Sequence, residues 1–173
     1  SNLDESILEN TYNKNTDITI LSYGDLGEEA LLKEDQGNLR NFIDLNLTSK
    51  FIILNYLSNR AKLNKNNSIV VISSVAGDRG RRSNYIYGSM NAALTQFTSG
   101  MRSYLHKKNV HLLTVKPGLI ITPMTKKFKK SFLWSKPEKI APSIYEAIIK
   151  KKEVIYTPKF WYLVMLVIKI IPE

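Results

Sequence analysis

Four short apolar runs, separated by longer segments, limit the folds that this chain can adopt. The runs cover residues 17–22, 69–72, 110–115 and 153–157. The second run is continuous and β-branched, which is typical of a strand buried on both faces of a parallel sheet. The segments between the runs are too long for hairpin loops, and those at 39–57 and 83–106 carry apolar residues at helical spacing. The sequence therefore predicts an α/β chain with a parallel sheet and right-handed crossovers.

The composition agrees with a single globular domain over residues 1–173. Hydrophobic residues make up 43% of the chain and charged residues 23%, and no repeat or linker divides it. We expect no clear element in the polar residues 1–16 and an apolar C-terminal segment over 160–173. Because the chain has no cysteine and only two histidines, we predict no metal site, and a cytoplasmic location fits. No apolar stretch reaches the roughly 20 residues that span a bilayer.

Polar residues and glycines follow the ends of three predicted strands. They are Tyr23-Gly24, Ser73-Ser74 and Pro117-Gly118. Ligands of open parallel α/β sheets bind at the carboxyl ends of the strands. We therefore expect these three segments to converge on one crevice.

Ser74 and Tyr87 can perform acid–base chemistry in such a crevice. A phenol with its usual pKa near 10 is a poor base at neutral pH, but a nearby cation lowers that pKa. The tyrosine then exchanges a proton with an alcohol or carbonyl oxygen, which the serine hydroxyl can hold. The natural place for the cation is one helical turn beyond Tyr87, where the chain has Asn91.

From about residue 17 onward, the chain resembles the short-chain dehydrogenase/reductase superfamily. The motifs that carry the resemblance are Gly24-x-x-Gly27, Asn46 within the following helix, Ser73-Ser74-Val75-Ala76-Gly77, Tyr87-Gly88-Ser89-Met90-Asn91 and Pro117-Gly118-x-x-x-Thr122. The resemblance implies a three-layer Rossmann-like fold, NAD or NADP as cofactor, and dimers or tetramers formed through the helix at 84–105. It also implies the type of reaction, which is the interconversion of a keto group and an alcohol.

The resemblance assigns roles to individual residues. Tyr87 would be the acid/base, Ser74 would hold the reacting oxygen, and Asn46 would organise a proton-relay water. The residues expected to contact the cofactor are Gly24, Ser73, Tyr87, Asn91, Pro117, Gly118 and Thr122. The stretches 73–89 and 154–172 resemble a narrower branch that reduces keto-sugars carried on polyprenyl phosphate. We therefore expect a lipid-linked or nucleotide-linked sugar as substrate.

Two departures from the family pattern leave an alternative open. The family has lysine where this chain has Asn91, and no lysine lies between Lys65 and Lys107. The family's glycine-rich nucleotide loop has no counterpart in residues 1–16, so we expect the N-terminal βαβ portion of the fold to be missing. The alternative function is therefore a catalytically weak or inactive subunit that acts as a binding partner.

The net charge of +10 permits two interpretations. Lysine is either simply the commonest surface residue, or it attracts anionic partners such as phosphates and lipid head groups. The apolar segment 160–171 is typical of a buried helix or of a subunit interface. The alternative is a segment that lies in the membrane interface. That alternative predicts peripheral contact with the inner face of the membrane. We expect no nucleic-acid partner, because aromatic residues are not regularly interleaved with the basic runs.

Overall fold

The computed structural model describes residues 8–9, 16–60 and 67–172, and the structural statements below concern these residues. Most of the predicted N-terminal segment 1–16 lies outside them. In chain order the elements are β1 (Ile18–Leu21), α2 (Glu29–Glu34), α3 (Gln36–Ile43), the π-helical segment η1 (Asp44–Thr48), α4 (Ser49–Arg60), β2 (Ser68–Ile72), the 3₁₀ turn η2 (Val75–Asp78), α5 (Tyr85–His106), β3 (His111–Pro117), the 3₁₀ turn η3 (Pro123–Thr125), α6 (Pro137–Ile149), β4 (Val154–Thr157) and α7 (Trp161–Ile170).

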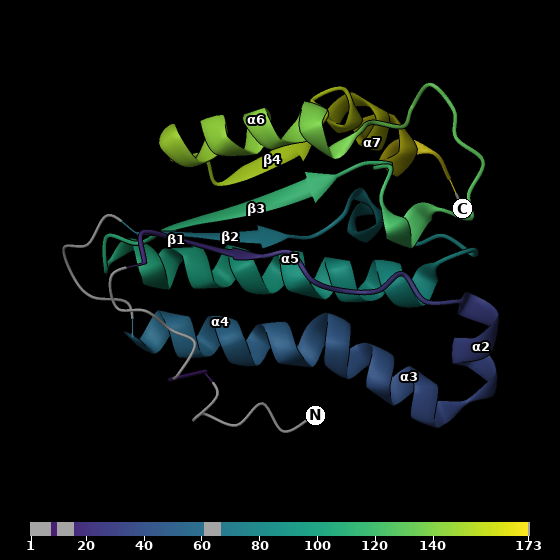
Figure 1. Ribbon diagram of the computed structural model, residues 1–173, viewed down its shortest axis with the longest axis horizontal. Coiled ribbons are helices and arrows are strands. Elements are labelled where there is room, and N and C mark those ends of the chain that lie inside the picture. The colour runs from purple at the N-terminus through teal and green to yellow at the C-terminus, as the bar shows by residue number, and fades with distance from the viewer. Residues whose placement is uncertain (1–7, 10–15, 61–66, 173) are drawn as a thin grey trace.

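The four strands form one parallel sheet in the order β1-β2-β3-β4. Helices α4 and α5 lie on one side of the sheet and α6 on the other, which gives three layers (Figure 1). The predicted three-layer α/β fold is therefore confirmed.

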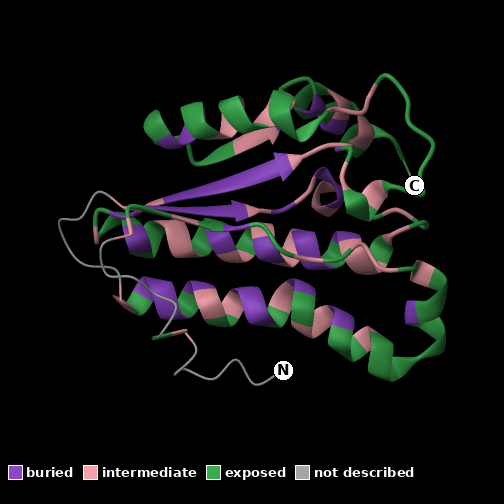
Figure 2. Ribbon diagram, viewed as in Figure 1, coloured by how far each residue is buried: buried purple, intermediate pink, exposed green. Residues whose placement is uncertain are grey.

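The pattern of β2 explains why both faces of the sheet are covered. Ile69 and Val71 pack against α4 and α5, whereas Val70 packs against α6. Successive side chains of a strand point to opposite faces, so a continuous apolar run needs a helix layer on each side. Figure 2 shows the two central strands, β2 and β3, buried between helices that are partly exposed.

One predicted helix differs from the structure in detail. The helix predicted over 39–57 consists of α3, the π-helical segment η1 and α4. Helix α6 begins at Pro137, and Pro142 lies inside it rather than in its first turn. Proline suits the first helical position because its fixed φ fits the helix and its missing N–H would have no partner there.

A buried ion pair joins the loop after β2 to the other half of the sheet. Lys116 Nζ on β3 lies 2.6 Å from Asp78 Oδ1, and these side chains are 10% and 4% exposed. The Tyr156 hydroxyl on β4 donates to Asp78 Oδ2 at 2.6 Å. Burial, and then the neighbouring Asp78 carboxylate, raise the pKa of Tyr156, so this donor keeps its proton. The network holds η2, and with it the end of β2, against β3 and β4.

The C-terminal helix α7 is buried on one side only. Trp161 and Met165 are buried against Val75, whereas Leu163, Val167 and Ile170 are 62%, 60% and 75% exposed. No helix in the described part of the chain is both long enough and apolar enough to cross a bilayer. One face of α7 is therefore buried, as expected for a buried helix. The other face is apolar and exposed.

Candidate active site

The three loops at the carboxyl ends of the strands meet in one cavity, as predicted. The cavity has a volume of about 400 Å³, a size typical of small-molecule sites. Every predicted site residue lines it, namely Gly24, Asn46, Ser73, Ser74, Tyr87, Asn91, Pro117, Gly118 and Thr122. Parallel strands bring their carboxyl ends to the same edge, which explains why residues so far apart in the sequence converge.

Ser74 and Tyr87 reach this cavity from the two ends of one connection. Ser74 follows β2, and its Oγ accepts a hydrogen bond from the Ala76 N–H at 3.1 Å, which caps η2. Tyr87 lies in the first turn of α5. Burial raises the pKa of the Tyr87 phenol, and hydrogen bonding to the Ser74 and Asn91 side chains partly opposes that rise. The serine and the tyrosine therefore share one site, while their catalytic roles remain predictions.

A π-helical turn, which the sequence did not predict, sets the position of Asn46. It lies within the π-helical segment η1 and is only 5% exposed. Its Nδ2 donates to the Phe42 carbonyl, and its Oδ1 accepts from the Asp25 N–H, both at 3.0 Å. π-Helical turns frequently occur at functional sites, where they redirect a side chain. Here the side chain ties the helix to the loop after β1, and a role in a proton relay remains a prediction.

The amide of Asn91 occupies the position where the sequence suggested a cation. Its Nδ2 donates to the Tyr87 carbonyl at 2.9 Å, one turn earlier in α5. The Ser73 hydroxyl contacts the Asn91 carbonyl at 3.2 Å and the Thr95 hydroxyl at 3.0 Å. The Ser73 hydroxyl therefore fastens the end of β2 to α5, and any contact that Ser73 makes with a cofactor remains a prediction.

The end of β3 forms the opposite wall of the cavity. Gly118 donates its N–H to the Thr157 carbonyl at 3.1 Å, and Thr122 begins η3 with a reciprocal hydrogen-bond pair to Thr125. A Cβ on Gly118 would lie 1.9 Å from Trp161 Nε1, so only glycine allows α7 to approach this loop. That indole nitrogen is buried and has no hydrogen-bond acceptor within the described residues.

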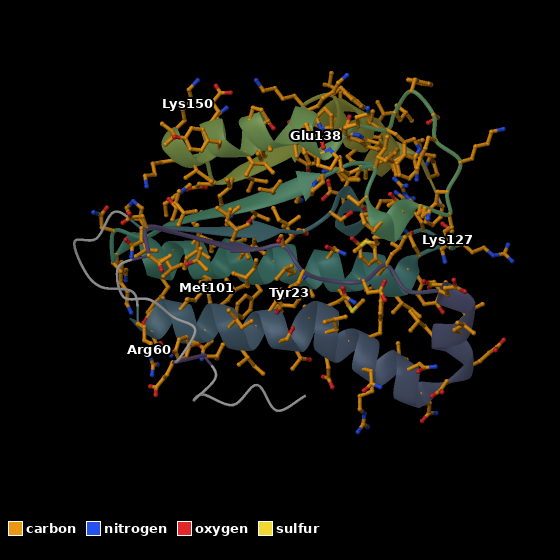
Figure 3. All side chains as sticks on the ribbon, viewed as in Figure 1. Tyr23, Arg60, Met101, Lys127, Glu138 and Lys150 are labelled. Atoms are coloured by element: carbon orange, nitrogen blue, oxygen red, sulfur yellow. The ribbon has the colours of Figure 1, made fainter. Side chains whose placement is uncertain are left out.

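Among the residues that line the cavity, Lys50 and Trp161 were not predicted from the sequence. Lys50 lines it from α4, next to Tyr23, whose position is labelled in Figure 3. Lys50 is far from Tyr87 in the sequence, because it lies on α4 whereas Tyr87 lies on α5. The residues that neighbour Tyr87 in the chain therefore give no sign of it. Trp161 lies in the apolar segment that we predicted to be a buried helix or a subunit interface. Nothing in the sequence around Trp161 indicates that it contacts Gly118.

Glycine at position 24 is required by the close approach of these side chains. Gly24 has a positive φ of 152°, and a Cβ there would lie 2.8 Å from Asn46 Oδ1 and 3.4 Å from Lys50 Nζ. The glycine in the predicted motif thus makes room for side chains of the neighbouring helix.

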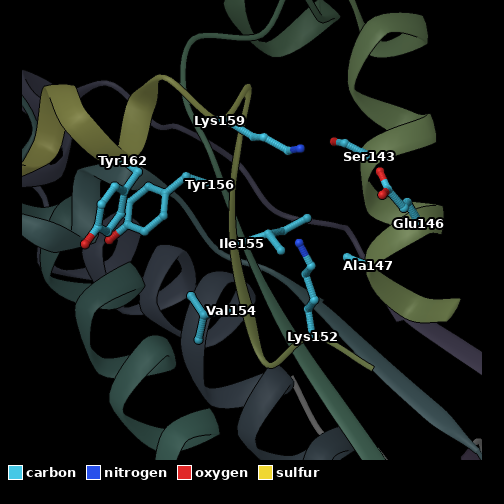
Figure 4. A pocket seen from close by; sticks show the side chains of 9 residues that line it. All are labelled: Ser143, Glu146, Ala147, Lys152, Val154, Ile155, Tyr156, Lys159 and Tyr162. Carbon is cyan, nitrogen blue, oxygen red and sulfur yellow. The ribbon is translucent and has the colours of Figure 1, made fainter. Parts of the chain in front are cut away.

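A second hollow, of about 300 Å³, lies beside β4 and α6 and is shown in Figure 4. Its polar lining includes Lys152, Lys159 and Glu146, all of them exposed. It contains neither Ser74 nor Tyr87. We therefore place the candidate active site in the first cavity.

A parallel sheet with helices on both faces and a cavity at its carboxyl edge defines the class of Rossmann-like α/β proteins. The profile of the short chain dehydrogenase family matches residues 9–132. The chain therefore belongs to the short-chain dehydrogenase family. The match to the narrower keto-sugar reductase branch remains a prediction.

Individual relatives agree with this assignment. An uncharacterized oxidoreductase of Mycobacterium tuberculosis is 34% identical to the chain over 139 residues, which are 80% of this chain and 56% of that protein. The chain thus spans little more than half the length of that relative.

Solved structures show the same fold. A short chain dehydrogenase of Burkholderia cenocepacia, in complex with NADP, aligns with a TM-score of 0.74 and 18% identity over 87% of this chain and 64% of its own. A 4-hydroxyisoleucine dehydrogenase, complexed with NADH and succinate, aligns with a TM-score of 0.64 and 22% identity over 81% of this chain and 65% of its own.

Proposed function

We propose that the protein carrying this chain is an NAD(P)-dependent oxidoreductase that interconverts a keto group and an alcohol. The observation that carries the proposal is the meeting of Ser74 and Tyr87 in one cavity at the carboxyl edge of the sheet. Membership of the short-chain dehydrogenase family supports it.

Tyr87 acts as the acid in the direction of reduction. Because burial raises the pKa of its phenol above the ordinary value near 10, the phenol keeps its proton at neutral pH. The Tyr87 hydroxyl can then donate that proton to a carbonyl oxygen as the oxygen gains negative charge. The hydroxyl of Ser74 holds the same oxygen and keeps it within reach of Tyr87.

The residues around the ends of β1 and β3 suit the nicotinamide part of a dinucleotide. Gly24 and Gly118 line the cavity, and the buried Trp161 Nε1 lacks an acceptor within the described residues. The other residues proposed to hold the cofactor are Ser73, Asn91, Pro117 and Thr122. When bound, the reduced nicotinamide supplies the hydride. One solved relative holds NADP and another NADH, so we propose either cofactor without a preference.

The surroundings of the cavity support a lipid-linked or nucleotide-linked sugar as substrate. Phe128 and Trp134 line the cavity with their rings stacked 6.4 Å apart, and Lys130 Nζ lies 4.0 Å from the Trp134 ring centroid. The loop that carries them thus combines apolar rings with a cation. Such a surface can bind a sugar with its phosphate, next to an apolar carrier.

The proposal is tested with the protein at its full natural length. We expect oxidation of NADH or NADPH, followed by the nicotinamide absorbance, when a keto-sugar on polyprenyl phosphate or on a nucleotide is added. The corresponding alcohols are the matched controls and should cause no oxidation of the reduced cofactor. If the protein binds the dinucleotide but no keto compound of the panel is turned over, the inactive-subunit alternative is supported instead.

The exposed face of α7 leads to a separate prediction about membranes. Replacing Leu163, Val167 and Ile170 together by serine should lower the fraction bound to anionic vesicles about tenfold, because apolar area drives such binding. Co-sedimentation with vesicles measures the fraction. Ile149→Ser on α6, which is 61% exposed, is the control and should leave binding unchanged. Equal sedimentation of the triple variant and the parent protein would contradict membrane contact through α7.

A further inference from the structure

Lys50 brings a positive charge to the active-site cavity from a helix that does not carry Tyr87. It lies on α4, four residues after Asn46, and is only 5% exposed. It lines the same cavity as Tyr87 and Asn91. Its Nζ lies 3.4 Å from the point that a Cβ on Gly24 would occupy, so the ammonium group reaches the loop after β1.

Among the described residues, the ammonium group of Lys50 has no partner of opposite charge. It lies 5.3 Å from the centroid of the Tyr23 ring, and within residues 16–60 and 67–172 it forms no ion pair or hydrogen bond. Burial lowers the pKa of Lys50 to about 8, so the group is still charged at neutral pH. A lysine that only covers apolar surface extends its ammonium group into water. A buried, unpaired ammonium group costs free energy, and this one faces a cavity that can hold a ligand or a reacting group.

Within the described residues, the other charged groups that line the cavity form no ion pair with Lys50. The Asp25 carboxylate accepts a hydrogen bond from the Gly27 N–H at 3.2 Å, and the Arg81 guanidinium donates to Met165 Sδ at 3.7 Å. The Tyr23 hydroxyl forms a hydrogen bond with Ser49 Oγ at 2.8 Å. Lys50 and Tyr87 therefore line the same cavity, and within the described residues no ion pair there neutralises the charge of Lys50.

We propose that Lys50 supplies from α4 the positive charge that Asn91 cannot supply from α5, and that this charge stabilises the Tyr87 oxygen during proton transfer. The inference rests on the proposed acid role of Tyr87. In that step the Oη–H bond of Tyr87 breaks and an O–H bond forms on the substrate oxygen. The electron pair of the broken bond stays on Oη as phenolate, and Lys50 keeps its own proton. Lys50 thus acts on proton transfer through its positive charge and transfers no proton itself.

The first test measures the ionisation of Tyr87 without any cofactor. NMR of tyrosine labelled with ¹³C at Cζ gives the pKa of the phenol, and Tyr87→Phe identifies its signal. Arginine keeps its charge at high pH and methionine has none, so the pKa of Tyr87 should be at least about one unit lower in Lys50→Arg than in Lys50→Met. The parent protein should resemble Lys50→Met at high pH, because Lys50 has lost its proton there.

A surface lysine provides the matched control for this measurement. Lys33 Nζ lies 5.1 Å from the centroid of the Tyr85 ring, in the same kind of contact as that between Lys50 and Tyr23, but it is exposed. Lys33→Met should therefore leave the pKa of Tyr87 unchanged.

The second test uses turnover by the protein at its full natural length. The kcat/KM for reduction should fall as the pH rises through about 8, because Lys50 loses its charge, and Lys50→Arg should move that fall to higher pH. Lys50→Met should lower the rate at pH 7 about tenfold or more. Adding Asn91→Lys to that variant should restore it, since the charge then comes from α5.

An equal pKa of Tyr87 in Lys50→Arg and Lys50→Met would overturn the proposal, and so would a Lys50→Met protein with full activity. Both results leave the proposed oxidoreductase function intact. Conversely, an absence of turnover with every keto compound would reject that function, while the NMR comparison would still report whether the charge at position 50 reaches Tyr87.

Discussion

Replacing Tyr87 by phenylalanine is expected to lower the kcat/KM for keto reduction by about 10²- to 10⁴-fold. This range is typical for the loss of a general acid. The substitution removes one oxygen and keeps the ring that contributes to packing around Phe42 and Met90. The loss therefore reports proton transfer rather than unfolding, and steady-state kinetics with the keto substrate measure it.

Tyr85→Phe is the matched control for this prediction. Tyr85 lies two residues earlier, at the start of α5, and is 44% exposed. The same oxygen is removed there, but outside the cavity, so kcat/KM should not change. Full activity of Tyr87→Phe would remove Tyr87 from the mechanism. An equal loss in both variants would indicate that the effect arises from the start of α5 as a whole.

Replacing Asp78 by alanine is expected to lower the free energy of unfolding by about 3–5 kcal/mol. The substitution leaves the Lys116 ammonium group buried without its carboxylate, and breaking one partner of a buried pair has a cost of this size. The Tyr156 hydroxyl loses its acceptor as well. Urea denaturation followed by circular dichroism measures the change.

Two further variants separate the buried pair from a general effect of charge. Glu146→Ala breaks the exposed pair with Lys150 and should leave the free energy of unfolding nearly unchanged, because water and salt screen a pair on the surface. Adding Lys116→Met to Asp78→Ala should recover most of the lost stability, because the buried charge is then gone. A single Asp78→Ala variant as stable as the Glu146→Ala variant would show that the network contributes little.

The fold could be predicted because its signals are local. A continuous apolar run such as 69–72 requires cover on both faces, and the length of the connections requires parallel strands. The same geometry explains why Ser74 and Gly118 were predicted to share a crevice, since both follow strands of one parallel sheet. The π-helical segment at 44–48 could not be predicted, because its register depends on the contacts of Asn46 with Phe42 and Asp25.

By itself, the sequence determined the layered α/β fold and the convergence of Ser74 and Tyr87, because periodicity and strand ends are properties of neighbouring residues. Only the tertiary structure showed that Lys50 also lines that site. The chain places an amide at Asn91, where the charge was expected, and a lysine at position 50 that no local pattern connects to Tyr87. The packing of α4 beside α5 brings Lys50 to the cavity, and contacts between helices depend on side chains that are distant in sequence.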